Sequence, residues 1–199
     1  FLAPNSIVGC GIEMAPEAEW SGVKAKYELP DEYVLYLGRV SKAKVDKLLP
    51  YFLRCKAKYG GDAKLVLVGG FENEIRKFDS PDILFTGYVS DEEKTAIVRH
   101  ATVMVNPSPM ESLSLLMLEG MQSRIPLLVN GRSKVMKDHC RLSGAGLWYN
   151  NGRDFRKKLH RLLSDPELRR TMSEKGPAYV REHYDWEIII PKPVSYTHL

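Results

Sequence analysis

The sequence alternates short apolar runs with stretches whose apolar residues recur at helical spacing. The runs contain β-branched residues, and glycine or asparagine follows each within two residues; they fall at residues 33–37, 64–68, 83–85, 102–105, 126–129 and 147–149. Runs that are apolar at every position indicate strands buried on both faces, as in a parallel sheet covered by helices. The pattern therefore predicts an α/β fold with a Rossmann-like, doubly wound parallel sheet of five or six strands.

The stretches between these runs predict helices at residues 45–59, 91–100, 114–122, 153–163 and 166–182. Ser90 is a natural N-cap for the second helix, and Pro166 suits the first position of the last. Pro50 lies inside the first stretch, where it predicts a kink or a later helix start. Doubly wound sheets bind ligands where their strands end. The loops that qualify follow Leu37, Val68, Phe85, Val105 and Val129.

The composition limits the class of protein. The chain has 199 residues, of which 44% are hydrophobic and 27% charged, the usual balance of a soluble globular domain. No apolar run approaches the roughly 18 residues of a membrane span. The net charge is +4, and the basic residues are scattered among acidic ones without interleaved aromatics. This disfavours nucleic acid as a partner and fits a phosphorylated small molecule or an anionic membrane surface.

The cysteines and histidines indicate neither disulfide bonds nor metal ligands. Cys10, Cys55 and Cys140 are too widely spaced for a disulfide framework or a zinc knuckle. We therefore expect a reducing, cytoplasmic setting, with the inner membrane surface as a further place that the charge would fit. Four isolated histidines are interpreted as surface or helix-end residues without a catalytic role: His100, His139, His160 and His183.

Both ends of the sequence look unlike those of a complete protein. Residues 1–30 are interpreted as an interdomain segment whose first 13 residues form a strand and a turn from the middle of a longer chain. The domain itself is expected at residues 31–190. Residues 194–199 match one reading frame of the transposase end sequence used in DNA library preparation, so residues 191–199 are expected to be a non-native tail. The alternative is a natural polar tail.

The loop after residues 102–105 carries the side chains best suited to chemistry. Small hydroxyl residues there precede a helix, and the unpaired N–H groups of a first helical turn form an anion site. Glu111 precedes this helix and Glu119 follows eight residues later, a helical span of about 12 Å. The two catalytic carboxyl groups of a glycosidase lie roughly 5–9.5 Å apart. Glu111 and Glu119 are therefore better placed to bind the two ends of a larger, phosphate-containing ligand. The alternatives are a capping carboxylate for Glu111 and a surface helix residue for Glu119.

The loop after residues 33–37 adds positive charge. Gly38 lets the backbone approach a ligand closely, and Arg39 and Lys44 suit a diphosphate. The alternative is a solvated basic loop. Lys42 is the alternative to Lys44 as the lysine that binds the phosphate.

The Glu-x7-Glu pattern, after a Pro-Ser loop and before residues 125–129, resembles the signature of the group 1 glycosyl transferases. These are retaining nucleotide-sugar enzymes of the GT-B fold, often called glycosyltransferase family 4. Tyr36-Leu37-Gly38-Arg39 with Lys44 is similar to the family's donor-phosphate strand. Further matches follow in order along nearly the whole chain: Leu67-Val68-Gly69, residues 85–90, Val129-Asn130-Gly131 and residues 184–187. Residues 112–114 depart from the family's usual glycine-rich turn.

The resemblance implies a role for each matching residue. Gly38, Arg39 and Lys44 would hold the donor diphosphate, Glu111 would be the catalytic residue at the transferred sugar, and Glu119 would accept hydrogen bonds from the ribose. Further implied contacts come from backbone N–H groups, for phosphate and sugar, and from two residues that border the base: Ser112, Leu113, Ser114 and Leu115, and Tyr88 and Val89. No metal and no other cofactor is expected, because helix-end and Arg/Lys charges stabilise the leaving group.

The resemblance also implies what the chain does. It would be the C-terminal, donor-binding half of a hexosyl-type transferase that moves a sugar to an acceptor such as a cell-surface glycan or lipid. The acceptor domain would precede Phe1, and the fragment alone would be inactive. Alternatives are a sugar-nucleotide epimerase of the same fold and a non-catalytic nucleotide-sugar-binding module. Without the acceptor domain, we expect an exposed apolar patch at Tyr184, Trp186, Ile188, Ile189 and Ile190.

Overall fold

The computed structural model describes residues 11–72 and 80–189 and contains one sheet of six parallel strands in the order β3-β2-β1-β4-β5-β6. The strands are β1 (Tyr33–Leu37), β2 (Lys64–Val68), β3 (Ile83–Gly87), β4 (Val103–Asn106), β5 (Leu127–Asn130) and β6 (Gly146–Tyr149). The strand order reverses between β1 and β4, which is the switch point of a doubly wound sheet. The predicted α/β fold class is confirmed.

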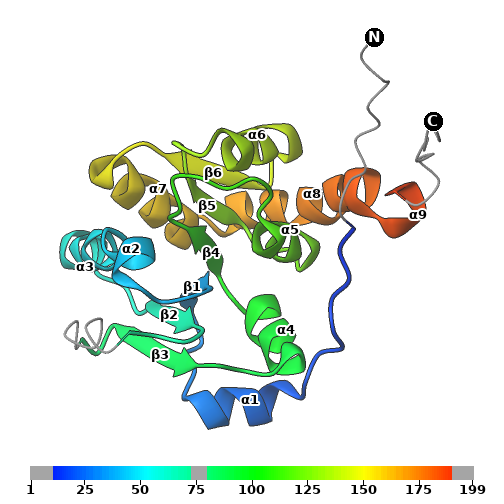
Figure 1. Ribbon diagram of the computed structural model, residues 1–199. Helices are drawn as coiled ribbons and strands as arrows, with labels where there is room; N and C mark the ends of the chain where they lie inside the picture. Colours follow the sequence, from blue (N-terminus) through cyan, green and yellow to red (C-terminus); the bar gives the residue numbers. More distant parts are fainter. Residues whose placement is uncertain (1–10, 73–79, 190–199) are drawn as a thin grey trace.

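Helices cover both faces of the sheet (Figure 1). They are α1 (Trp20–Tyr27), α2 (Lys42–Val45), α3 (Leu48–Tyr59), α4 (Asp91–Arg99), α5 (Leu115–Gln122), α6 (Lys134–Ser143), α7 (Gly152–Ser164), α8 (Pro166–Tyr184) and α9 (Trp186–Ile189). One hydrophobic cluster packs α1, α4, α5, α6 and α8 on one face, and a second packs α3 and α7 on the other. In the part of the chain that the structure describes, no helix is long and apolar enough to cross a bilayer.

Several helices differ from the sequence-based expectation. The helix predicted at residues 45–59 begins only at Leu48, as α3, and the short α2 precedes it. Pro50 lies in the first turn of α3, where its missing N–H costs little. Helices α1, α6 and α9 were not predicted. Val23 is the one buried residue of α1, so this helix shows no apolar period. Helix α6 is amphipathic, but its buried face includes the polar His139 and Ser143.

The segment around α9 is covered, which corrects the expectation of an exposed apolar patch. Tyr184 packs against the first hydrophobic cluster, and Ile189 is only 2% exposed. Gly11 and Ile12 lie against this segment: the amide of Ile12 donates to the Tyr184 carbonyl at 3.2 Å, and the Trp186 ring lies against Gly11. Trp186 itself remains 42% exposed. Ile190 and the side chain of Ile188 lie outside the described residues, as do residues 1–10 and 191–199.

His139 is buried, which corrects its interpretation as a surface histidine. Helix α6 turns it toward α8, where its Nδ1 lies 2.8 Å from the Tyr179 hydroxyl. Burial lowers the pKa of His139 and raises the pKa of the neighbouring Cys140 thiol to about 12. Cys140 and Cys55 are buried free thiols, and Cys10 lies outside the described residues.

Candidate functional site

A cleft of about 270 Å³ opens where the sheet reverses its strand order, at the carboxyl ends of β1 and β4. We call it the β1–β4 cleft. Doubly wound sheets bind their ligands at this point. The cleft brings together seven of the residues that the sequence predicts for a site: Gly38, Arg39, Lys44, Glu111, Leu113, Ser114 and Leu115.

The backbone of the β1–α2 loop is fixed by its neighbours. Gly38 has φ +129°, and its N–H donates to the Val68 carbonyl at 3.0 Å. The hydroxyl of Tyr36 donates to the Arg39 carbonyl at 2.9 Å. Burial, with a smaller contribution from the Glu111 charge, raises the pKa of Tyr36 to about 12, so it stays a neutral donor. The main chain beneath Arg39 is therefore held in place while its side chain faces the cleft.

The loop between β4 and α5 is organised by the asparagine that ends β4. The side chain of Asn106 accepts from the Ser108 amide at 3.0 Å and donates to the Ser114 hydroxyl at 3.0 Å. The Ser108 hydroxyl in turn donates to the Met110 carbonyl at 2.9 Å. These bonds shape the loop that carries Glu111 into the cleft.

The first turn of α5 points free N–H groups at the cleft. Ser114 is the N-cap residue, but its side chain makes no capping hydrogen bond, and the first turn has no acidic residue. The first N–H groups of a helix have no partner within the helix. Those of Leu115 and Leu116 are thus available to an anion, and the helix dipole strengthens the attraction.

Glu111 and Lys44 face each other across the cleft. Glu111 Oε1 lies 4.0 Å from Lys44 Nζ, and the two side chains are 26% and 49% exposed. A partly exposed pair at this distance contributes roughly 0–1 kcal/mol. Neither charge is therefore committed to the other, and both remain available to a ligand.

Glu119 is largely buried, so its interpretation as a surface residue is wrong. It lies in the second turn of α5, outside the β1–β4 cleft, and its side chain is 13% exposed. One carboxylate oxygen lies 3.4 Å from Lys94 Nζ on α4, and the other is buried without a hydrogen-bond donor among the described residues. A buried carboxylate oxygen without a donor is costly, and a ligand hydroxyl would supply one.

Tyr88 and Val89, between β3 and α4, have different environments. Tyr88 is 85% exposed and lines a shallow groove of about 500 Å³ together with Arg39. Because Arg39 also lines the β1–β4 cleft, the two spaces adjoin. Val89 packs against the hydrophobic core instead.

Ser112 also lies outside the β1–β4 cleft and lines a separate cavity with Glu111 and Arg132. Sequence reasoning missed Tyr36, Asn106 and Asn130. The last two each end a strand after a valine, and a polar residue in that position of a parallel sheet was the signal that could have found them. Among residues 11–72 and 80–189, no group of three or more His, Cys, Asp or Glu side chains is placed to hold a metal ion.

Comparisons with known proteins identify the family of the chain. The model of the family described as "Glycosyl transferases group 1" matches residues 22–179. An alpha-D-kanosaminyltransferase of Streptomyces kanamyceticus is 30% identical over 174 residues, which are 80% of this chain and 44% of that protein. The chain thus spans less than half the length of this curated relative.

Solved structures show the same fold. The C-terminal domain of a group 1 glycosyl transferase from Francisella tularensis superposes with a TM-score of 0.70 at 18% identity, over 86% of this chain and 95% of that domain. Anabaena HepE, solved with UDP and glucose, gives a TM-score of 0.68 at 14% identity over 85% of this chain and 49% of its own. The fold is therefore that of the C-terminal half of a GT-B protein. Since the family model matches most of its length, this chain belongs to the group 1 glycosyl transferases.

Proposed function

We propose that this chain binds the nucleotide-sugar donor of a retaining glycosyltransferase, with the diphosphate in the β1–β4 cleft. The observation that carries the proposal is the convergence in one cleft of Arg39, Lys44 and the uncapped first turn of α5. A guanidinium fork, an ammonium and free backbone N–H groups are the partners that a diphosphate needs.

The same groups would assist the transfer. When the bond between the sugar and the diphosphate breaks, negative charge develops on the leaving phosphate. The main chain at Arg39 and the first turn of α5 are fixed by the fold, and with the Arg39 and Lys44 side chains they would stabilise this charge. The unpaired N–H groups and fixed charges would thereby lower the barrier to departure of the nucleoside diphosphate.

The two glutamates would bind the two ends of the donor. Glu119 has a buried oxygen without a donor, and ribose hydroxyls would satisfy it after a small rotation of the side chain. Glu111 lies beside Lys44 at the open side of the cleft, where the transferred sugar would meet it. Tyr88 would border the base, because its groove continues from Arg39. The presence of both UDP and glucose in the structure of Anabaena HepE supports this class of ligand.

The acceptor would bind to another part of the full-length protein. The chain spans 33% and 44% of two curated relatives, so the remainder of such a protein has room for an acceptor domain. We propose a sugar acceptor at the inner membrane surface or in the cytoplasm and expect this chain alone to give no transfer, because positioning supplies much of the rate. The product's anomeric configuration, read by NMR on the full-length enzyme, tests retention.

Titration calorimetry tests the donor assignment. We expect UDP, GDP or ADP to bind this chain with and without a chelator, and Arg39→Ala to weaken binding about tenfold or more, since charged hydrogen bonds contribute roughly 1.5–3 kcal/mol. Arg54→Ala, an exposed change on α3 outside the cleft, is the matched control. Loss of binding in chelator, or equal losses in both variants, would contradict the proposal.

A further inference from the structure

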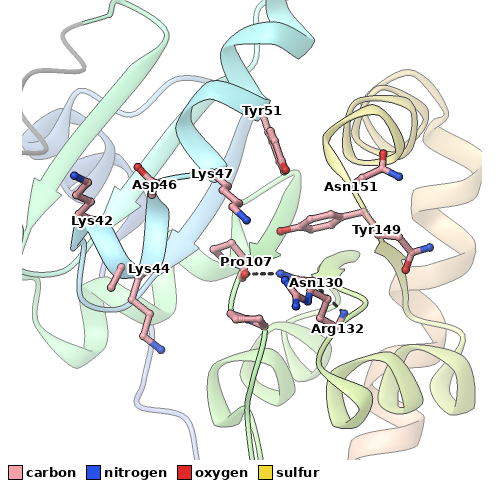
Figure 2. A pocket seen from close by; sticks show the side chains of 13 residues that line it. Lys42, Lys44, Asp46, Lys47, Tyr51, Pro107, Asn130, Arg132, Tyr149 and Asn151 are labelled. Carbon is pink, nitrogen blue, oxygen red and sulfur yellow. Dashed lines mark hydrogen bonds between the residues drawn. The ribbon is translucent and has the colours of Figure 1, made fainter.

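A second cavity, of about 510 Å³, lies beside the β1–β4 cleft and shares Pro107 and Lys44 with it. We call it the basic cavity. It lies at the carboxyl ends of β4, β5 and β6, between the α2–α3 region and the start of α7 (Figure 2). The roles proposed above for donor binding leave most of its lining unused.

Tyr149 is the buried polar group of this cavity. Its side chain is 4% exposed, and its ring packs edge-on against Tyr51 and Phe155 at centroid distances of 6.4 and 5.0 Å. Its hydroxyl points into the cavity, toward Lys47 (Figure 2), and has no hydrogen-bond partner among the residues that the structure describes. The ring is buried while the hydroxyl faces the cavity, so it is free to donate a hydrogen bond to a ligand there.

The charges around Tyr149 select an anion. Four cationic side chains line the cavity against one carboxylate, that of Asp46; the four are Lys42, Lys44, Lys47 and Arg132. Within the described ranges, neither Lys47 nor Arg132 forms an ion pair. Lys47 Nζ points between the two tyrosine hydroxyls (Figure 2). Uncompensated positive charge in a concave site concentrates anions.

The walls of the basic cavity are fixed in advance. The side chain of Asn130 donates to the Pro107 carbonyl at 2.9 Å and accepts from the Arg132 amide at 3.1 Å, so one residue ties two of the lining loops together. On the opposite side, Tyr51 lies so close to Gly152 that a Cβ there would stand 2.5 Å from the ring. A preformed site loses little entropy on binding.

We propose that the basic cavity binds the phosphate monoester of a sugar or a similar polyol, separately from the donor diphosphate. Lys47 and Arg132 pair with the phosphate, and the hydroxyl of Tyr149 donates to it. The amides of Asn150 and Asn151 at the rim meet ligand hydroxyls. The volume lies within the ~300–1,000 Å³ range of small-molecule sites. The inference does not depend on the donor assignment, because Lys47, Arg132 and Tyr149 lie outside the β1–β4 cleft.

Calorimetry with glucose 6-phosphate as the probe tests the site. We expect glucose 6-phosphate to bind at least about tenfold more tightly than glucose. Lys47→Gln and Arg132→Gln should each weaken it about tenfold, and Tyr149→Phe, which keeps the packed ring, should weaken it several-fold. Lys157→Gln, which removes an exposed charge of α7, should leave binding unchanged. Absence of binding, or equal effects in all four variants, would overturn the proposal.

Two further binding measurements distinguish a sugar phosphate from inorganic phosphate and from the donor diphosphate. Inorganic phosphate should bind about tenfold more weakly than glucose 6-phosphate, and equal affinities would overturn the sugar part of the proposal. Saturating UDP should leave glucose 6-phosphate binding in place, and Arg39→Ala should weaken UDP alone. Displacement of glucose 6-phosphate by UDP would overturn the proposal, because the phosphate would then occupy the β1–β4 cleft. A failure of UDP binding leaves this readout intact, so the two proposals fail separately.

Discussion

Two regions of the molecule differ in how completely their buried polar groups are paired. Where α6 meets α8, every one of these groups is paired: His139 with the Tyr179 hydroxyl at 2.8 Å, and the Ser143 hydroxyl with the His139 carbonyl at 2.7 Å and the Ala145 amide at 3.0 Å. Near the carboxyl edge of the sheet, Ser108 and Ser114 are also paired, but one oxygen of Glu119 is buried without a partner among the described residues. The Tyr149 hydroxyl there faces the basic cavity and has no partner in the described part of the chain.

The difference separates groups that hold the fold from groups that await a ligand. A paired buried group contributes to stability, whereas an unpaired one costs free energy that a ligand can recover. The backbone at the carboxyl edge is nevertheless as tightly determined as the core. Substitutions in the two regions should therefore differ in their effects on stability and on ligand binding.

The largest effect should come from the backbone of the β1–β4 cleft. Gly69 has φ +128°, and a Cβ there would lie 2.3 Å from the Gly38 carbonyl oxygen, a backbone atom. Gly69→Ala should lower the free energy of unfolding by about 3 kcal/mol, from φ strain and overpacking. Gly144→Ala is the matched control: its φ is +65°, and its Cβ would meet the flexible Lys175 side chain. That change should cost about 1 kcal/mol. Urea denaturation measures the free energy of unfolding of both variants. Equal losses would contradict the claim that the Gly38 carbonyl leaves no room for a side chain at residue 69.

The next effect concerns ligand binding by Glu119. Glu119→Ala should weaken a nucleoside diphosphate by roughly 1.5–3 kcal/mol, because it removes charged hydrogen bonds to the ribose. A 2′,3′-dideoxy analogue should be insensitive to the change. Glu111→Ala should leave the affinity for the nucleoside diphosphate nearly unchanged, since its partner is the sugar. A similar loss for both nucleotides in calorimetry would reject the ribose contact.

The smallest effect compares two buried tyrosines. Tyr179→Phe leaves His139 Nδ1 buried without its partner and should cost about 1–2 kcal/mol of unfolding free energy. Tyr149→Phe removes a hydroxyl that has no partner in the described part of the chain, so the free energy of unfolding should change by less than about 0.5 kcal/mol. Chemical denaturation measures both variants. The contrast between the regions fails if Tyr149→Phe destabilises the chain as much as Tyr179→Phe.

The sequence predicted the sheet because its strands are apolar on both faces, a signal that needs no tertiary context. It predicted the composition of the β1–β4 cleft because glycine, arginine and hydroxyl residues follow strands. Helix α6 is amphipathic but was not predicted, because two residues of its buried face are polar: His139 and Ser143, which pair with α8 and with the main chain.

The partial burial around α9 was not predicted for a similar reason. Gly11 and Ile12, which lie against this segment, are far from it in the sequence. The basic cavity is lined by residues that are far apart in the sequence, from Lys47 to Tyr149, so no local sequence pattern predicts it. Local propensity thus located the strands and their loops, and long-range packing decided which polar side chains were left unpaired.

Backbone amide NMR of this chain during a UDP titration tests the central claim most directly. The account predicts the largest shifts at Gly38, Arg39, Leu115 and Leu116, which surround the β1–β4 cleft. The amides of Arg132, Tyr149 and Asn151, around the basic cavity, should shift little. The opposite pattern, with the largest shifts around the basic cavity and none at the first turn of α5, would contradict a diphosphate in the β1–β4 cleft.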